Sequence, residues 1–196
     1  MSRPTTRVLV LSLAASLALT GVVLAGCQPG TRAAEALKAG NAALAKYAQL
    51  EQATEAKMAE AASVQPTPEG VQPGIDALAE VAKQMPGRRA AAAEALKQFQ
   101  EFKAAATDDK QKAYAEKAIA LAASLAALDK GTTTLMNDMT ELYRLVLDNS
   151  ADTARVSKLA DAVSKGQTQY DKLSANVRDL SDAANAYYQA NLAVKK

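Results

Sequence analysis

Apolar residues in the second half of the chain recur at alternating steps of three and four, which is typical of helices packed along a coiled-coil-like seam. The first such seam, after Tyr114, consists of Ala118, Leu121, Leu125, Leu128, Thr132, Leu135, Met139, Leu142 and Val146. A second seam consists of Val156, Leu159, Val163, Gly166, Tyr170, Leu173, Val177, Leu180, Ala184 and Tyr187. The residues between the seams, 148–152, favour turns and helix caps. So short a connection predicts an antiparallel hairpin of two long helices.

A third apolar stripe lies upstream of this hairpin. Its members are Ile75, Leu78, Ala82, Met85, Ala92, Leu96 and Phe99. Pro86-Gly87 interrupts it and predicts a kink or break, because proline removes a helical hydrogen bond. Thr107-Asp108-Asp109 predicts the next turn and an N-cap. Residues 75–196 are therefore predicted to form an antiparallel up-down helical bundle of three helices, and the fold class is all-α.

Residues 32–62 form a predicted N-terminal helix with a thinner stripe, made of Leu37, Leu44, Tyr47, Leu50 and Met58. Residues 63–74 are rich in proline and predict a semi-rigid linker. The pattern leaves two roles open for this helix: a fourth member of the bundle or a stalk.

The composition agrees with helices, since alanine, leucine, lysine, glutamate and glutamine dominate and tryptophan is absent. Alanine at facing positions lets helices approach closely. A hairpin that turns near Ser150 places Gly131 and Thr132 level with residues 166–168, so that small residues face each other. We interpret this level as a close helix crossing; the alternatives are a hinge and a groove for a partner.

The N-terminus has the pattern of an export signal. Arg3 and Arg7 precede an apolar run over residues 8–23, and Leu24-Ala25-Gly26-Cys27 follows as a lipobox. This predicts a lipoprotein signal peptide over 1–26, lipidation of Cys27, a tether over 27–31 and a place on the extracytoplasmic face of the cell membrane. The alternative is an uncleaved transmembrane anchor, because the run approaches the ~20 residues that span a bilayer.

Charge and residue types exclude several functions. The chain has 23 basic and 21 acidic residues, and cleavage after residue 26 removes two arginines and no acid. The balanced mature chain lacks the basic footprint of a nucleic-acid binder. We interpret Arg88-Arg89 and Lys195-Lys196 as solvated charges at a helix end or in the tail; the alternative is that they form local basic patches for anionic lipid or wall polymer. Histidine is absent, the one cysteine is assigned to the anchor, and phosphate-loop or nucleophile-elbow motifs are missing. We therefore expect no enzymatic activity, no cofactor and no metal site.

Aromatic residues converge on one end of the predicted bundle. A turn near Asp108 brings Phe99 and Phe102 beside Tyr114. The last helix adds Tyr187, Tyr188, Asn185, Gln189 and Asn191. Tyrosines among amides can stack on sugar rings, which makes this group a candidate ligand patch. The alternative is that the rings cap the core.

Several segments together resemble a known family. They are the lipobox, the proline-bearing break, the run Lys-Ala-Tyr-Ala-Glu-Lys-Ala-Ile at 112–119, Glu141-Leu142-Tyr143, and Ala186-Tyr187-Tyr188-Gln189. In this layout the chain resembles the cell-wall-binding lipoproteins of Gram-positive bacteria (YkyA-like). The resemblance implies a lipid-anchored, helical, non-catalytic envelope protein and carries over no site residues.

The leading functional hypothesis is a membrane-anchored interaction or spacer module, with peptidoglycan or another envelope protein as its partner. Its rival is a carrier or chaperone whose bundle opens to accept a lipid or an unfolded segment. An internal groove lined by leucine, methionine and valine would favour the carrier. Self-association through the N-terminal helix is a third hypothesis.

Overall fold

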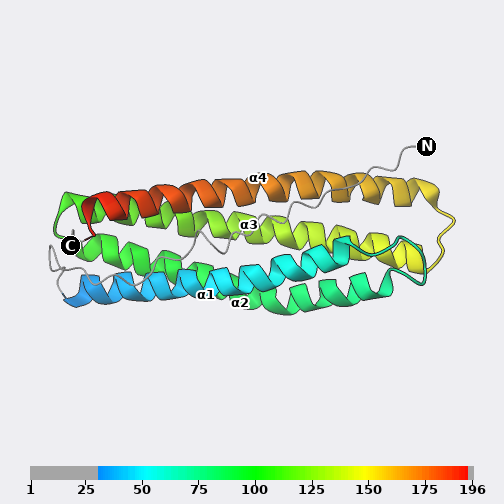
Figure 1. Cartoon of the computed structure of the whole chain (residues 1–196), viewed down its shortest axis with the longest axis horizontal. Helices are drawn as coiled ribbons and strands as arrows, with labels where there is room; N and C mark the ends of the chain where they lie inside the picture. Colours follow the sequence, from blue (N-terminus) through cyan, green and yellow to red (C-terminus); the bar gives the residue numbers. More distant parts are fainter. Residues whose placement is uncertain (1–30, 194–196) are drawn as a thin grey trace.

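The protein is a bundle of four long antiparallel helices in the computed structural model, which describes residues 31–193 (Figure 1). The helices are α1 (Thr31–Ala62), α2 (Gln72–Ala105), α3 (Asp109–Leu147) and α4 (Thr153–Asn191). Within the described range there is no strand. The predicted all-α class and antiparallel hairpins are confirmed. Because α1 packs along α2, the N-terminal helix is a fourth member of the bundle.

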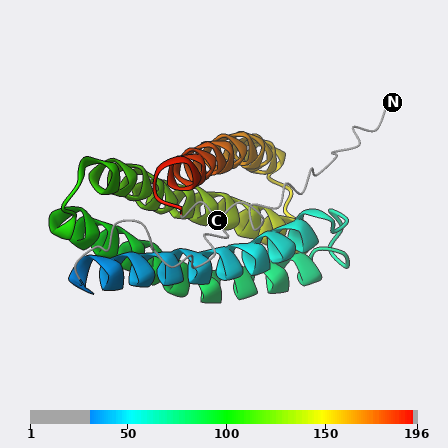
Figure 2. The same ribbon diagram turned by 60° about the vertical axis from the view of Figure 1, so that its left-hand side comes forward.

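The four helices form two stacked hairpins, α1–α2 and α3–α4, in both views (Figures 1 and 2). In the described part, extensive packing joins helices that follow each other in the chain, namely α1 with α2, α2 with α3, and α3 with α4. The start of α1 and the end of α4 lie at one end of the bundle, and the α1–α2 linker lies at the other (Figure 1).

The turns are formed by the residues that predict them. Asp108 caps α3 by accepting a hydrogen bond from the Gln111 backbone N–H at 2.8 Å, and Asp152 caps α4 by accepting one from the Arg155 backbone N–H at 2.9 Å. Asn149 takes the left-handed conformation with φ 47°, which asparagine tolerates better than most residues. Local side-chain chemistry therefore sets where α3 and α4 begin.

The predicted break at Pro86 is wrong, because α2 runs continuously through this residue. Pro86 is exposed, while Met85 and Arg88 beside it are 3% and 0% exposed. The proline ring thus lies on the outer face of α2, and the packing of its neighbours outweighs one lost helical hydrogen bond. The helix also begins three residues before Ile75, at Gln72, with Pro73 in its first turn, where proline is tolerated.

The core is divided into two clusters along the bundle. The larger lies toward the α2–α3 turn and draws on all four helices, including Leu44, Phe99, Leu125 and Val177. The smaller lies toward the α3–α4 turn. Its fully or mostly buried members are Ala61, Ala77, Leu78, Val81, Met85, Leu135, Met136 and Met139. A polar layer separates the two clusters and is described below.

The small residues of α3 and α4 do not face one another, which corrects the predicted register. A Cβ atom at Gly131 would lie 2.8 Å from Leu173 Cδ1, and one at Gly166 would lie 3.2 Å from Leu135 Cδ1. Each glycine therefore makes room for a leucine of the other helix. α3 and α4 approach each other closely because large side chains of one helix pack against small residues of the other along the seam.

Candidate functional site

A buried polar network lies between the two core clusters and joins all four helices. Its members are Tyr47 and Glu51 of α1, Arg88 of α2, Asp129 of α3 and Tyr170 of α4. The side chains of Arg88 and Glu51 are 0% exposed and that of Asp129 is 2% exposed. Charged groups so deep in a protein are rare unless they are paired.

Arg88 is the centre of the network. Its Nη2 atom lies 2.5 Å from Glu51 Oε2 and 2.7 Å from Asp129 Oδ1, and it donates a hydrogen bond to the Tyr47 hydroxyl at 2.7 Å. The guanidinium carbon also lies 5.1 Å from the centre of the Tyr47 ring, within the range of a cation–π interaction. One arginine on α2 thereby holds side chains of α1 and α3.

The two tyrosines complete the connections. The Tyr47 hydroxyl donates to Asp129 Oδ1 at 2.8 Å, and the Tyr170 hydroxyl donates to Glu51 Oε1 at 3.1 Å. Tyr47 and Glu51 are four residues apart and therefore lie on the same face of α1. The Tyr170 bond joins α4 to α1, two helices that are not neighbours in the chain.

The network contains two carboxyl groups and one guanidinium group. Burial raises the pKa of Glu51 above its ordinary value, and the opposing effect of Arg88 is smaller. Burial likewise raises the pKa of Asp129, against Arg88 and the Tyr47 hydrogen bond. Burial by itself would lower the pKa of Arg88, but Glu51, Tyr47 and Asp129 raise it above its usual range. Arg88 is therefore positively charged, and burial shifts both carboxyl groups toward their protonated forms.

The interpretation of Arg88-Arg89 as solvated charges is wrong for Arg88 and right for Arg89. Arg89 is exposed and donates to the Thr133 hydroxyl at 2.9 Å. Arg88 follows Met85 by three residues and precedes Ala92 by four, so it occupies a position of the apolar stripe of α2. A charged residue within an apolar stripe is predicted to be buried with that stripe. Asp129, four residues after Leu125, occupies the same kind of position.

The aromatic group at the other end of the large cluster comes together as predicted. The ring centres of Tyr114 and Phe102 are 6.2 Å apart and those of Tyr114 and Tyr188 are 5.4 Å apart, both in edge-to-face geometry. Tyr114 is 0% exposed and Tyr188 6% exposed, so these two rings lie in the core. Burial also raises the pKa of the Tyr114 hydroxyl above its ordinary value.

The other members of the candidate patch lie nearer the surface. Tyr187 is half-buried, with Lys117 Nζ 5.5 Å from its ring centre. Asn185 is half-buried and Gln189 is exposed. The group is thus split between core and surface, and its two most central rings offer no free face to a sugar. This arrangement favours the alternative that the aromatic residues cap the core.

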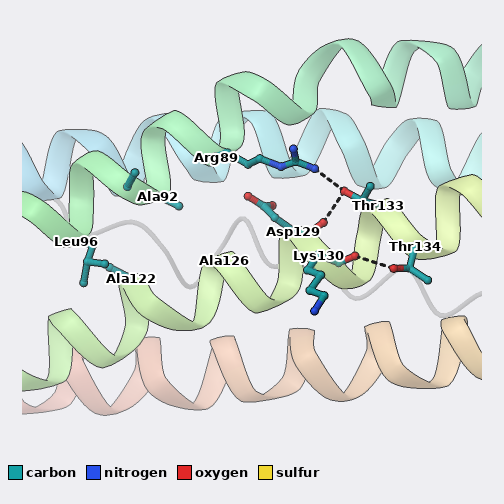
Figure 3. Close-up of a pocket in the computed structure, with 10 residues that line it drawn as sticks. Arg89, Ala92, Leu96, Ala122, Ala126, Asp129, Lys130, Thr133 and Thr134 are labelled. Atoms are coloured by element: carbon teal, nitrogen blue, oxygen red, sulfur yellow. Dashed lines mark hydrogen bonds between the residues drawn. The ribbon is translucent and has the colours of Figure 1, made fainter.

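Two hollows lie on the outside of the bundle. One of about 420 Å³ lies between α2 and α3 and is lined by apolar side chains and by charged ones (Figure 3). The apolar side chains include Ala92, Leu96 and Ala126, and the charged ones are Arg89, Asp129 and Lys130. A second, of about 760 Å³, lies on the same pair of helices nearer the α3–α4 turn and includes the Arg155–Glu141 ion pair. Both mix charged with apolar side chains, unlike the internal groove that a carrier needs.

The described residues contain no group of three or more histidine, cysteine, aspartate or glutamate side chains placed to hold a metal ion. Over the same range, no helix combines the length and the apolar character needed to cross a membrane. The lipobox and Cys27 lie outside the described residues. Comparison with protein-family models, curated proteins and solved structures finds no match to this chain.

Proposed function

We propose that the protein is a bacterial lipoprotein, anchored at the cell membrane through Cys27, that acts as a non-catalytic helical spacer or interaction module of the envelope. The observation that carries the proposal is the start of α1 at Thr31, only four residues after Cys27. A tether this short keeps that end of the bundle near the acyl chains. The α1–α2 linker and the α3–α4 turn then form the distal end (Figure 1).

The dimensions of the bundle suit a spacer. The longest helices contain 39 residues, which corresponds to about 58 Å at the usual rise per residue. Among the described residues, the one large apolar side chain that is clearly exposed is Leu147, at 39%, next to the α3–α4 turn. The sides of the rod are therefore suited to water, and the distal end is where contact with peptidoglycan or another envelope protein is expected. The YkyA-like resemblance supports the same role.

The anchor is tested first by labelling cells with radioactive fatty acid. The wild-type protein is expected to incorporate the label and Cys27→Ala to lose it, while Ser16→Ala, within the apolar run and outside the lipobox, keeps it. Labelling of Cys27→Ala, or none of the wild type, would overturn the anchor.

Orientation is tested with the acylated protein in vesicles that carry a quencher on their lipid headgroups. A fluorophore is attached to a cysteine introduced at Thr107, in the α2–α3 turn, or at Ala151, in the α3–α4 turn; both positions are exposed. Strong quenching at position 107 and weak quenching at 151 is the expected result. Equal quenching at both positions would mean that the rod lies along the membrane, and would contradict the spacer.

The partner is sought by presenting purified wall material and membrane extract to the soluble domain, residues 31–196, in parallel. Retention on wall material that is reduced by Leu147→Lys, at the distal end, supports wall binding there. Equal retention of Leu147→Lys and the wild type would place the contact elsewhere. Retention by neither fraction would contradict the interaction role and leave the spacer role to the orientation experiment.

A further inference from the structure

We infer that the central network of Glu51, Arg88 and Asp129 holds one proton in the folded protein at neutral pH and releases it when the bundle opens. The bundle would then be a clamp that mild acid tightens and alkali loosens. The inference does not depend on the membrane anchor, because every group involved belongs to the described helices.

The network contains more acidic than basic groups. The one guanidinium group contacts both carboxyl groups directly, and none of the three side chains is more than 2% exposed. With both carboxyl groups ionised, the layer would carry one uncompensated negative charge in the interior. Burial of an unpaired charge is so unfavourable that the group is neutralised instead. A single proton makes the layer neutral.

No other group next to the network supplies the missing positive charge among the described residues. From α1 the neighbour is Tyr47, and from α4 it is Tyr170; both are hydroxyl donors and carry no positive charge. From α2, Arg89 acts on Asp129 but is exposed and bonded to Thr133, so water screens it. Glu55 of α1, which acts on Tyr170, adds only negative charge. The charge therefore remains unbalanced without a proton.

Carboxyl oxygens of the network are available to hold the proton. Asp129 Oδ1 accepts from both Tyr47 and Arg88, whereas its Oδ2 is buried and has no hydrogen-bond partner among the described residues. Glu51 accepts from Tyr170 through Oε1. The raised pKa values of both carboxyl groups agree with proton uptake. Because the two groups share Arg88, the proton belongs to the pair and not to one residue.

Movement of α4 is coupled to the proton through Tyr170. The Tyr170–Glu51 hydrogen bond crosses between α1 and α4, whose contact is otherwise slight, and the first half of α4, up to Gly166, has no buried residue. Separation of α4 from α1 admits water to Glu51, which then ionises at its ordinary pKa. Thermodynamic linkage requires the reverse effect: a rise in pH favours the open form.

The sign of the pH dependence is fixed by the raised pKa values. The contribution of the bound proton to folding stability is complete below the ordinary pKa of the carboxyl groups. It is lost as pH rises toward the pKa that these groups have in the folded protein. One proton held only by the folded state lowers the folding equilibrium constant about tenfold per pH unit in this window. The effect runs opposite to that of surface ion pairs, which gain strength as carboxyl groups ionise.

The experiment measures protons released on unfolding of the wild-type protein at pH 7 in weakly buffered denaturant with an indicator dye. About one proton per molecule is expected, together with a tenfold loss of folding equilibrium constant per pH unit between pH 6 and 7. Infrared spectra of the folded protein at pH 7 are expected to show the stretching band of a protonated carboxyl group. Absence of both proton release and this band would overturn the inference.

Variants identify the group responsible. Glu51→Gln imitates the protonated state, so proton release and the pH slope are expected to disappear; Asp129→Asn is the second variant should the first fail to fold. Glu35→Gln, which removes an exposed carboxyl group from the same helix, is the matched control and is expected to keep both. Release that is unchanged in Glu51→Gln and Asp129→Asn would place the proton elsewhere and contradict the inference.

Discussion

Replacement of Arg88 by methionine is expected to destabilise the protein in a way that depends strongly on pH. Methionine fills much of the space of the arginine stem but removes the only positive charge in the buried layer. Glu51 and Asp129 then lose their shared ion pair, and Tyr47 loses a donor. Both carboxyl groups are expected to remain in the interior as neutral acids, so the folded variant needs one proton more than the wild type.

The loss in free energy of unfolding equals the cost of keeping that second proton bound. To keep a carboxyl group of ordinary pKa protonated at pH 7 costs about 4 kcal/mol, since each pKa unit corresponds to about 1.4 kcal/mol. The same cost falls to about 1 kcal/mol at pH 5. The value at pH 7 agrees with the ~3–5 kcal/mol typical of removing one partner of a buried ion pair. It is a large share of the ~5–15 kcal/mol that stabilise most domains.

The assay is urea unfolding followed by circular dichroism at pH 5 and pH 7. Arg88→Met is expected to lose about 4 kcal/mol at pH 7 and to recover most of it at pH 5. Arg89→Met, one residue away and exposed, is the matched control, with an expected change of less than about 0.5 kcal/mol. An equal loss for Arg88→Met at both pH values would refute the electrostatic reasoning and leave only a packing effect.

Three further predictions test the packing around the site. Gly131→Leu is expected to destabilise by about 1–3 kcal/mol, because its Cβ would lie 2.8 Å from Leu173 Cδ1; a higher melting temperature would refute close approach there. Tyr170→Phe removes one donor to Glu51 and is expected to cost about 1.5–3 kcal/mol, with faster amide exchange in α4; unchanged exchange would contradict the link to α1. Tyr188→Ala is expected to lower stability by about 3 kcal/mol without changing retention on wall glycan, whereas lost retention at an unchanged melting temperature would restore the sugar-binding patch.

Some features of the fold follow from the chain read locally. The steps of three and four through Leu121, Leu125 and Leu128 predict a helix with one dry face, and all three residues are 0% exposed. Asp108 and Asp152 predict the starts of α3 and α4, because a cap depends only on the next few residues. Periodicity and capping are short-range properties, and the amino-acid sequence alone determines them.

Other features depend on the partners that packing provides. Pro86 predicts a break by local rules, yet α2 continues, because the buried neighbours of the proline are held by other helices. Likewise, Leu173 faces Gly131 because of how far α3 and α4 are shifted along each other. The sequence of the turn does not specify this shift to within one helical turn.

The central network lies furthest from what sequence reasoning can reach. Tyr47 and Asp129 are 82 positions apart in the chain and meet through a hydrogen bond of 2.8 Å. In sequence, Arg88 looks like half of an exposed basic pair; in the bundle it neutralises carboxylates from two other helices. The sequence determined that the helices exist and which faces they bury. Only the tertiary structure decided which of the enclosed charges pair with one another, because compensation of a buried charge depends on which residues meet in space.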